Sequence, residues 1–189
     1  MIEQPQVLKT ERLMLRPFEV ADAKDIQRLA GDRAVADTTT SIPHPYKDGM
    51  AEAWVAHQAK SLAEGKEVTF AVALTETGEL VGAISLLDIQ AGHQAEIGYW
   101  FGKAYWGKGY GTEALQAVLR YAFTDLGLRR VHGRCLARNP ASGRVMLKNG
   151  FRHEGLRRGH SLKWGVLEDV ELYGVLREEW MEIARESCE

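Results

Sequence analysis

Apolar residues alternate with polar ones in the middle of the chain, a spacing typical of β-strands. Between residues 67 and 74 every second position is apolar, and runs over residues 80–89 and 93–101 follow after short turns. Consecutive strands joined by short turns indicate an antiparallel meander, because parallel strands need long crossover connections. The centre of the chain is therefore predicted to form three adjacent antiparallel strands.

On either side of this meander, apolar residues recur at intervals of three and four, the spacing of an amphipathic helix. Helices are predicted over residues 23–31 and 48–64 before the meander, and over 112–126 and 177–185 after it. A shorter helix is predicted over residues 139–148, since Asn is a good N-cap and Pro suits the first helical position.

The remaining segments complete the predicted order of elements. Further strands are expected over residues 10–17, 129–137, 152–160 and 166–176, and residues 32–46 have no clear period and are expected to form a long loop. This order predicts a mixed α/β protein of the α+β class, with a central, mostly antiparallel sheet of about seven strands flanked by helices. We expect a single domain spanning residues 1–189, with no linker.

Composition narrows the classes of function. Hydrophobic residues make up 45% and charged residues 26% of 189 residues, which is typical of a soluble globular domain. A net charge of −2 argues against a nucleic-acid-binding protein, and no apolar run approaches the roughly 18 residues of a membrane span. We expect no nucleic-acid partner and no membrane insertion.

Cysteine and histidine usage points to a reducing compartment and to no metal site. Cys135 and Cys188 are too few for a disulfide scaffold, and neither has the spacing of a zinc site. The six histidines are scattered, and no metal is expected. Because residues 1–6 contain no apolar h-region, the sequence predicts no secretory signal and a cytoplasmic location.

A glycine-rich stretch follows the third strand of the meander and leads directly into a helix. Gly107, Gly109 and Gly111 alternate with other residues there, and Lys108 lies among them. Glycine permits a positive φ and a close approach of the backbone to a ligand, and the N–H groups at a helix start bind anions. The stretch is read as a cradle for a diphosphate; a plain strand-to-helix turn is the alternative.

Two other phosphate motifs fit this stretch less well. Gly102 to Lys108 resembles a P-loop, but Gly109 stands where a P-loop has Ser or Thr to hold Mg²⁺. Residues 109–114 match the dinucleotide pattern G-x-G-x-x-A, yet the next strand ends at residues 136–139 without an acidic residue for a ribose. The antiparallel strands upstream also disagree with a doubly wound dinucleotide fold.

The sequence blocks around the glycine-rich stretch, taken in order, resemble the GNAT N-acetyltransferases. The resemblance is closest to the RimJ/RimL-type branch, which acetylates ribosomal proteins and other α-amines, and it covers nearly the whole chain. The blocks that carry it are residues 10–16, 42–46, 96–100, 106–114, 139–142, 149–151 and 169–173. The family's cofactor motif is usually R/Q-x-x-G-x-G/A, and here Trp106 occupies the first position.

This resemblance implies acetyl-CoA as the co-substrate. Its pyrophosphate would lie on residues 107–112, its pantetheine arm along the strand that ends at Phe101, and Asn139 would bond the arm through its side-chain amide. A plain helix cap is the alternative role of Asn139. The implied CoA-binding residues are Trp100, Phe101, Trp106, Gly107, Lys108, Gly109, Tyr110, Gly111, Thr112, Asn139 and Ser142.

Amide formation from a thioester needs a neutral amine, a polarised carbonyl and a proton for the leaving thiolate. Backbone N–H groups near Trp100 and Phe101 are candidates for polarising the carbonyl. Glu96 is the candidate base, and strand alternation puts it on one face with Gly98 and Trp100. A structural ion pair between Glu96 and an arginine is the alternative.

Ser142, in the first turn of the Asn-led helix, is the candidate proton donor to the CoA sulfur; a capping role is the alternative. Tyr110 and Tyr173 are alternative donors, although tyrosines on half-buried strands are usually core residues.

The acceptor is expected to be a primary amine, either a protein N-terminus or a small molecule, acetylated directly in a ternary complex. His44, Tyr46, Trp54 and Trp164 are candidates for lining its pocket, with packing as the alternative role of each. Two other functions stay open: a non-catalytic acyl-CoA-binding sensor on the same fold and a dinucleotide-dependent oxidoreductase. A homodimer through an edge strand is also left open.

Overall fold

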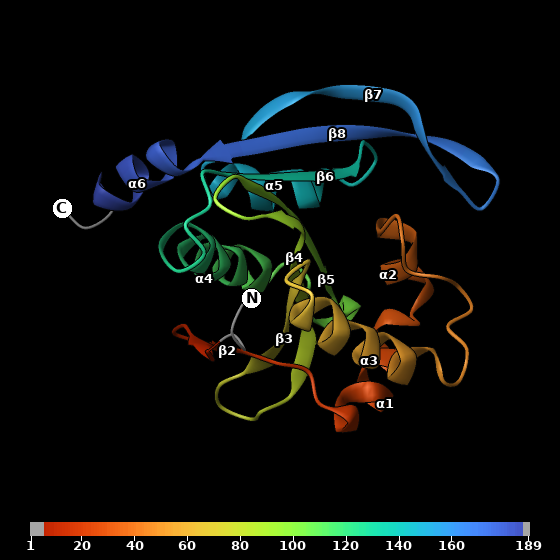
Figure 1. Ribbon diagram of the computed structural model, residues 1–189. Helices are drawn as coiled ribbons and strands as arrows, with labels where there is room; N and C mark the ends of the chain where they lie inside the picture. The colour runs from red at the N-terminus through yellow and green to blue at the C-terminus, as the bar shows by residue number, and fades with distance from the viewer. Residues whose placement is uncertain (1–5, 187–189) are drawn as a thin grey trace.

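An eight-stranded sheet, in the order β1-β2-β3-β4-β5-β6-β8-β7, runs through the computed structural model, which describes residues 6–186 (Figure 1). The strands are β1 (Leu8–Lys9), β2 (Leu13–Arg16), β3 (Val68–Leu74), β4 (Leu80–Gln90), β5 (Gln94–Phe101), β6 (Arg130–Leu136), β7 (Arg152–Lys163) and β8 (Val166–Leu176). The helices are α1 (Ala23–Ala30), α2 (Arg33–Thr38), α3 (Met50–Ala63), α4 (Tyr110–Thr124), α5 (Pro140–Lys148) and α6 (Arg177–Glu186), with 3-10 turns η1 (Val20–Asp22) and η2 (Lys103–Tyr105).

The antiparallel pattern of the sheet is interrupted at one pair of strands. β5 and β6 pair in parallel, whereas every other neighbouring pair is antiparallel. The parallel pairing ends at Ile97 and Gly133, although β5 continues to Phe101 and β6 to Leu136. The two strands therefore part over their last residues, and one edge of each has no strand partner there.

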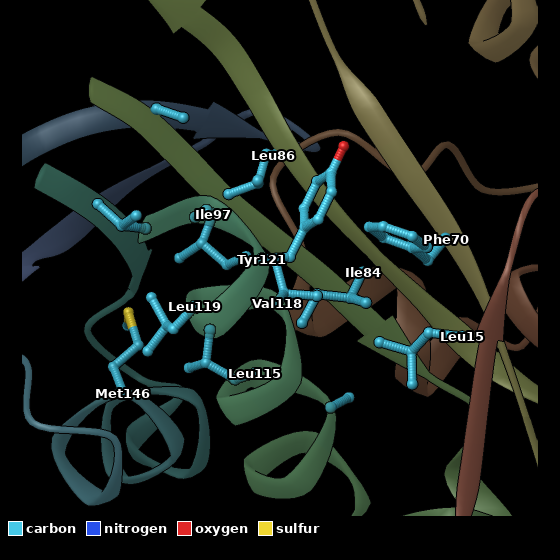
Figure 2. Close-up of a cluster of buried hydrophobic side chains, with 14 of the residues drawn as sticks. Leu15, Phe70, Ile84, Leu86, Ile97, Leu115, Val118, Leu119, Tyr121 and Met146 are labelled. Atoms are coloured by element: carbon cyan, nitrogen blue, oxygen red, sulfur yellow. The ribbon is translucent and has the colours of Figure 1, made fainter. Parts of the chain in front are cut away.

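Helices cover both faces of the sheet, because side chains alternate between faces along each strand. On one face α4 contributes Leu115, Val118 and Leu119 to a core with Ile84 and Ile97, all fully or almost fully buried (Figure 2). On the other face α1 and α3 pack against apolar residues of the intervening positions, among them Ala71 and Leu80. The sheet's centre, where β5 and β6 part, thus lies between two helical layers.

Most predicted elements are present, and the predicted mixed α/β class with a mostly antiparallel sheet is confirmed. One prediction is wrong: residues 32–46 do not form one long loop, because α2 occupies Arg33–Thr38. Asp32 caps this helix by accepting a bond from the N–H of Ala34 at 2.8 Å, and Val35 and Ala36 are buried. Six residues are too few to show a helical period, so burial rather than pattern defines this helix.

Smaller differences concern boundaries. The glycine-rich turn is shorter than predicted, since α4 begins at Tyr110 instead of residue 112. The two-residue strand β1 brings the sheet to eight strands, and β7 runs on to Lys163. The predictions made for residues 1–5 and for Cys188 lie outside the described residues.

Two properties of the described residues bear on function. None of their helices combines the length and apolarity that crossing a membrane requires. Across residues 6–186, no three His, Cys, Asp or Glu residues gather in a way that would hold a metal ion.

Candidate active site

A cavity of about 790 Å³ lies where β5 and β6 part. One side of it is formed by the glycine-rich turn and the start of α5, and the other by α3 and the segment 38–43. Most of the candidate residues from the sequence line it: Tyr46, Trp54, Glu96, Trp100, Phe101, Trp106, Gly107, Gly109, Tyr110, Gly111, Thr112, Asn139 and Ser142.

The glycine-rich turn has the backbone that a diphosphate cradle needs. Gly107 and Gly109 have φ of 74° and 82°, a left-handed conformation in which a side chain is strained. Gly109 is the N-cap of α4, whose first N–H groups have no partner within the helix. Trp106 ties the turn to the end of β5, because its indole Nε1 donates to the carbonyl oxygen of Phe101 at 2.7 Å. Exposed N–H groups at this helix start suit an anion.

Ser142 lies against a partly buried tyrosine, Tyr99, that the sequence did not indicate. The Oη of Tyr99 is 2.9 Å from Ser142 Oγ, and it donates to the Ser142 carbonyl at 3.0 Å. Burial raises the pKa of Tyr99 well above its ordinary value, so this phenol stays protonated at neutral pH. Alternation had separated Tyr99 from Glu96, but no pattern in the sequence indicated that α5 packs beside it.

Cys135 is a third polar group beside Ser142 and Tyr99. Its thiol interacts with Ser142, and burial raises the pKa of Cys135 to about 11. The thiol is therefore neutral and a poor nucleophile at neutral pH. This group of side chains therefore offers the hydroxyls of Ser142 and Tyr99 as proton donors, and no reactive thiolate.

Of the two alternative proton donors, Tyr110 lines the cavity and Tyr173 is not among its described lining residues. Tyr173 is buried and packs with its hydroxyl against Gly143, and it does not belong to the described residues that line the cavity. Tyr110 lines the cavity, with the guanidinium carbon of Arg12 at 4.9 Å from its ring centroid.

Glu96 lines the cavity and also forms the ion pair that the sequence left as its alternative role. The Nε of Arg134 lies 2.9 Å from Glu96 Oε1, and only 16% of the Glu96 side chain is exposed. His132 is the partner of Glu96 in the β5–β6 register, and burial lowers its pKa. Its imidazole is thus neutral at pH 7 and adds no positive charge beside this carboxylate.

Glu96 and Tyr99 belong to opposite faces of β5. Tyr99 meets α5, whereas Trp100, on the face of Glu96, packs with the cluster of α1 and α3. The gap between β5 and β6 connects the two faces through the cavity. A group on the α5 face and a group on the α3 face are therefore able to meet at this gap.

Asn139 is the N-cap of α5, as predicted, and both ends of its side-chain amide are engaged. Its Oδ1 accepts from the N–H of Ser142 at 3.4 Å, and its Nδ2 donates to the carbonyl of Thr38 at 3.2 Å. The cap thereby joins α5 to the segment that closes the far side of the cavity.

Three candidate residues lie apart from the cavity lining. His44 and Trp164 pack on each other with ring centroids 6.2 Å apart, and Lys108 Nζ lies 5.6 Å from the centre of the Tyr105 ring. None of the three is among the described residues that line the cavity. Aromatic character alone therefore did not separate packing residues from lining residues.

The structure also brings polar residues into the cavity that the sequence analysis missed. Thr69 Oγ1 lies 2.7 Å from Gln58 Oε1 and 2.9 Å from Ser85 Oγ, and both Gln58 and Ser85 line the cavity. These residues come from α3, β3 and β4, so their spacing in sequence gave no signal.

With this geometry in view, comparison with known proteins identifies the class. Residues 12–152 match the model of the acetyltransferase (GNAT) domain, and the chain belongs to this family of N-acetyltransferases. The chain is 32% identical over 178 residues to an uncharacterized N-acetyltransferase, p20, of Bacillus licheniformis, covering 93% of this chain and 98% of that protein.

Two further likenesses refine the class. A GNAT-family acetyltransferase from Bacillus anthracis has a solved structure that matches with a TM-score of 0.82 and 30% identity, over 92% of this chain and 100% of that one. The ribosomal-protein-serine acetyltransferase of Escherichia coli is 38% identical over 96 residues, half of this chain and 54% of that protein. The chain is thus an N-acetyltransferase that resembles the RimJ/RimL type, as the sequence blocks predicted. GNAT acetyltransferases use acetyl-CoA.

Proposed function

We propose that this enzyme transfers the acetyl group of acetyl-CoA directly to a primary amine while both substrates are bound. The observation that carries the proposal is the cavity at the parting of β5 and β6. An anion-binding turn and two hydroxyls border it on one side, and a carboxylate borders it on the other. This arrangement supports a ternary complex, in which proximity supplies much of the rate.

The CoA side of the proposal rests on backbone groups. The pyrophosphate binds to the N–H groups of residues 107–112, and the pantetheine arm follows the free edge of β5 toward Phe101. Backbone N–H groups near Trp100 and Phe101 receive the thioester oxygen as its negative charge grows. Asn139 contacts the arm only by exchanging its bond to Thr38, so its first role in the proposal is to hold the start of α5 beside the arm.

The chemistry needs two proton movements. As the amine nitrogen forms its bond to the acetyl carbon and the C–S bond breaks, Glu96 takes the amine proton, directly or through water. Ser142 gives a proton to the departing thiolate and takes one from the Tyr99 hydroxyl, 2.9 Å away. Tyr99 regains a proton from solvent, and Glu96 releases the amine proton to solvent before the next turnover. Because the pKa of Tyr99 is raised by burial, the donor stays loaded over the working pH range.

The acceptor in this proposal is a protein N-terminal α-amine or a small-molecule amine. It enters from the side of α3, where Tyr46, Trp54, Gln58 and Ser85 line the cavity. His44 and Trp164, which pack together outside the lining, act in the proposal by supporting the neighbouring segment 38–43. We also propose a cytoplasmic setting and a homodimer through the edge strand β7.

Thiol release is the test. Purified enzyme with acetyl-CoA and a panel of peptides and small amines is expected to liberate CoA and to add 42 Da, the mass of an acetyl group in place of hydrogen, to at least one acceptor. Gly109→Val, which strains a backbone at φ 82°, is expected to abolish acetyl-CoA binding while the protein remains folded. Binding of acetyl-CoA without turnover of any acceptor would favour the sensor, and unchanged affinity in the Gly109 variant would remove the cradle.

A further inference from the structure

We propose that Arg12, held by Glu113 and Thr10, is a positioning residue for the diphosphate cradle of the glycine-rich turn. We call these three residues the Arg12 clamp. The inference rests on the proposed CoA-binding function and adds residues from outside the glycine-rich motif. It also assigns a role to the block at residues 10–16, which the sequence analysis singled out and the reaction itself does not use.

Glu113 is the anchor of the clamp. Its Oε2 accepts from Arg12 Nε at 2.7 Å and lies 2.6 Å from Nη2. Its Oε1 accepts from the backbone N–H of Arg12 at 2.9 Å and from the hydroxyl of Thr10 at 2.6 Å. The carboxylate of Glu113, in the first turn of α4, is thereby fastened to the chain that leads into β2.

Arg12 in turn contacts Lys108 and Tyr110 and lies beside Gly109 between them. Its Nη1 donates to the carbonyl of Lys108 at 3.0 Å, and its guanidinium lies over the ring of Tyr110. A Cβ added to Gly109 would come within 3.3 Å of Nη2. The guanidinium therefore supports the turn from behind, at the residues whose N–H groups are proposed to bind the diphosphate.

The clamp also answers an electrostatic problem. The N-terminus of α4 favours an anion, but a carboxylate in its first turn would repel a bound diphosphate. Burial alone would raise the pKa of Glu113, but the bonds from Thr10 and Arg12 outweigh burial and lower it, so Glu113 is ionised at neutral pH. The paired charge of Arg12 offsets this anion. Arg12 thus holds the geometry of the cradle and cancels the charge beside it.

A comparison of two acetyl donors tests the clamp. Arg12→Met is expected to raise the KM for acetyl-CoA about tenfold or more, with kcat within about twofold, because the cradle loses its support and gains an unpaired carboxylate. The KM for S-acetylpantetheine, which carries no diphosphate, should stay unchanged. Glu113→Gln removes the repelling charge, so the double variant Arg12→Met/Glu113→Gln should recover part of the affinity for acetyl-CoA.

Two further variants test whether the effect is specific to Arg12. Arg12→Lys keeps the charge and loses the planar fork, so an intermediate KM is expected even if Arg12→Met folds poorly. Arg130→Met breaks another paired arginine, bonded to Glu154 at 2.7 and 2.6 Å, and should leave the KM values for both donors unchanged. An equal rise in KM for the two donors, or an unchanged KM for acetyl-CoA in Arg12→Met, would overturn the clamp. Failure of the wild-type enzyme to bind acetyl-CoA would instead overturn the proposed function.

Discussion

At the scale of single residues, Glu96 combines an ion pair with a position in the cavity lining. Its carboxylate is fixed by Arg134 at 2.9 Å and also borders the cavity. An ion pair orients a carboxylate, and a fixed orientation suits a base that must lie within reach of the amine proton. The ion pair with Arg134 is therefore compatible with the proposed role of Glu96 as a base.

Matched substitutions separate the two roles of Glu96. Glu96→Gln is expected to lower kcat by about a hundredfold, the low end of general-base effects, with the largest loss at low pH where the amine is protonated. Arg134→Gln removes the same ion pair but keeps the carboxylate, so it should lower kcat by much less. The measurement is the pH–rate profile of both variants. Equal losses in the two variants would leave Glu96 with a purely structural role.

The hydroxyls of Ser142 and Tyr99 support a second prediction at this scale. Ser142→Ala is expected to lower kcat about tenfold or more, since a positioned acid contributes to departure of the thiolate. The defect should shrink with acetyl thioesters whose leaving thiols are more acidic, because these thiols need less help from a proton donor. Steady-state rates over a series of such thioesters provide the check. A defect of constant size across the series would argue for a packing role.

At the scale of elements, the connection from β2 to α1 is held by a partly buried ion pair. Arg16 Nη1 and Nη2 donate to the two carboxylate oxygens of Asp22 at 2.8 Å each, and the N–H of Glu19 donates at 2.8 Å as well. Burial would raise the pKa of Asp22, but these bonds outweigh it and lower the pKa. The pair thus fixes the start of α1, whose Ile26 and Ala30 line the cavity.

Asp22→Asn is expected to lower the free energy of unfolding at pH 7 by about 2–4 kcal/mol, because it leaves a partly buried Arg16 without its anion. The folded-state pKa of Asp22 lies below its unfolded value, so its contribution is present above about pH 4 and is lost as pH falls through the folded pKa. Urea unfolding at pH 7 and pH 3 measures both effects. A difference between wild type and variant that is as large at pH 3 as at pH 7 would contradict this account.

At the scale of the whole molecule, the long hairpin β7–β8 reaches across to the N-terminal helices (Figure 1). Arg138 bonds Asp37 at 2.9 Å and Glu168 at 2.8 Å, and Lys163 Nζ donates to the carbonyl of Thr39 at 2.5 Å. Together with the bond from Asn139 to Thr38, these contacts fasten one wall of the cavity to β7, β8 and α5. Segments more than a hundred residues apart thereby hold this wall of the cavity, on the side where we propose that the acceptor enters.

Arg138→Gln is expected to widen this entrance. The KM for the acceptor amine should rise about three- to tenfold, in line with the 1 kcal/mol or so expected of an exposed network of charges. The KM for acetyl-CoA should change by less than about twofold, since the glycine-rich turn is not part of this network. Kinetics with each substrate varied in turn gives the result. A larger effect on acetyl-CoA than on the acceptor would show that the contacts serve the CoA side.

The sequence by itself determined most of the order of the elements and the position of the glycine-rich turn. Strand and helix periods are local patterns, so the strand at residues 67–74 could be predicted without knowing what packs against it. The turn at residues 107–111 could be predicted for the same reason, because the turn itself requires glycine at positive φ. The cap at Asn139 followed for the same reason, because capping is decided within four residues.

Only the tertiary structure decided which distant groups share the site. The parting of β5 and β6, the meeting of Tyr99 with Ser142, and the pairing of Arg12 with Glu113 join residues 36 to 101 positions apart. Helix α2 likewise depends on tertiary packing, because its Val35 and Ala36 are buried. Its six residues are too few to show a helical period in the sequence. Local patterns fix backbone conformation, whereas the packing of elements on the two faces of the sheet fixes chemical proximity.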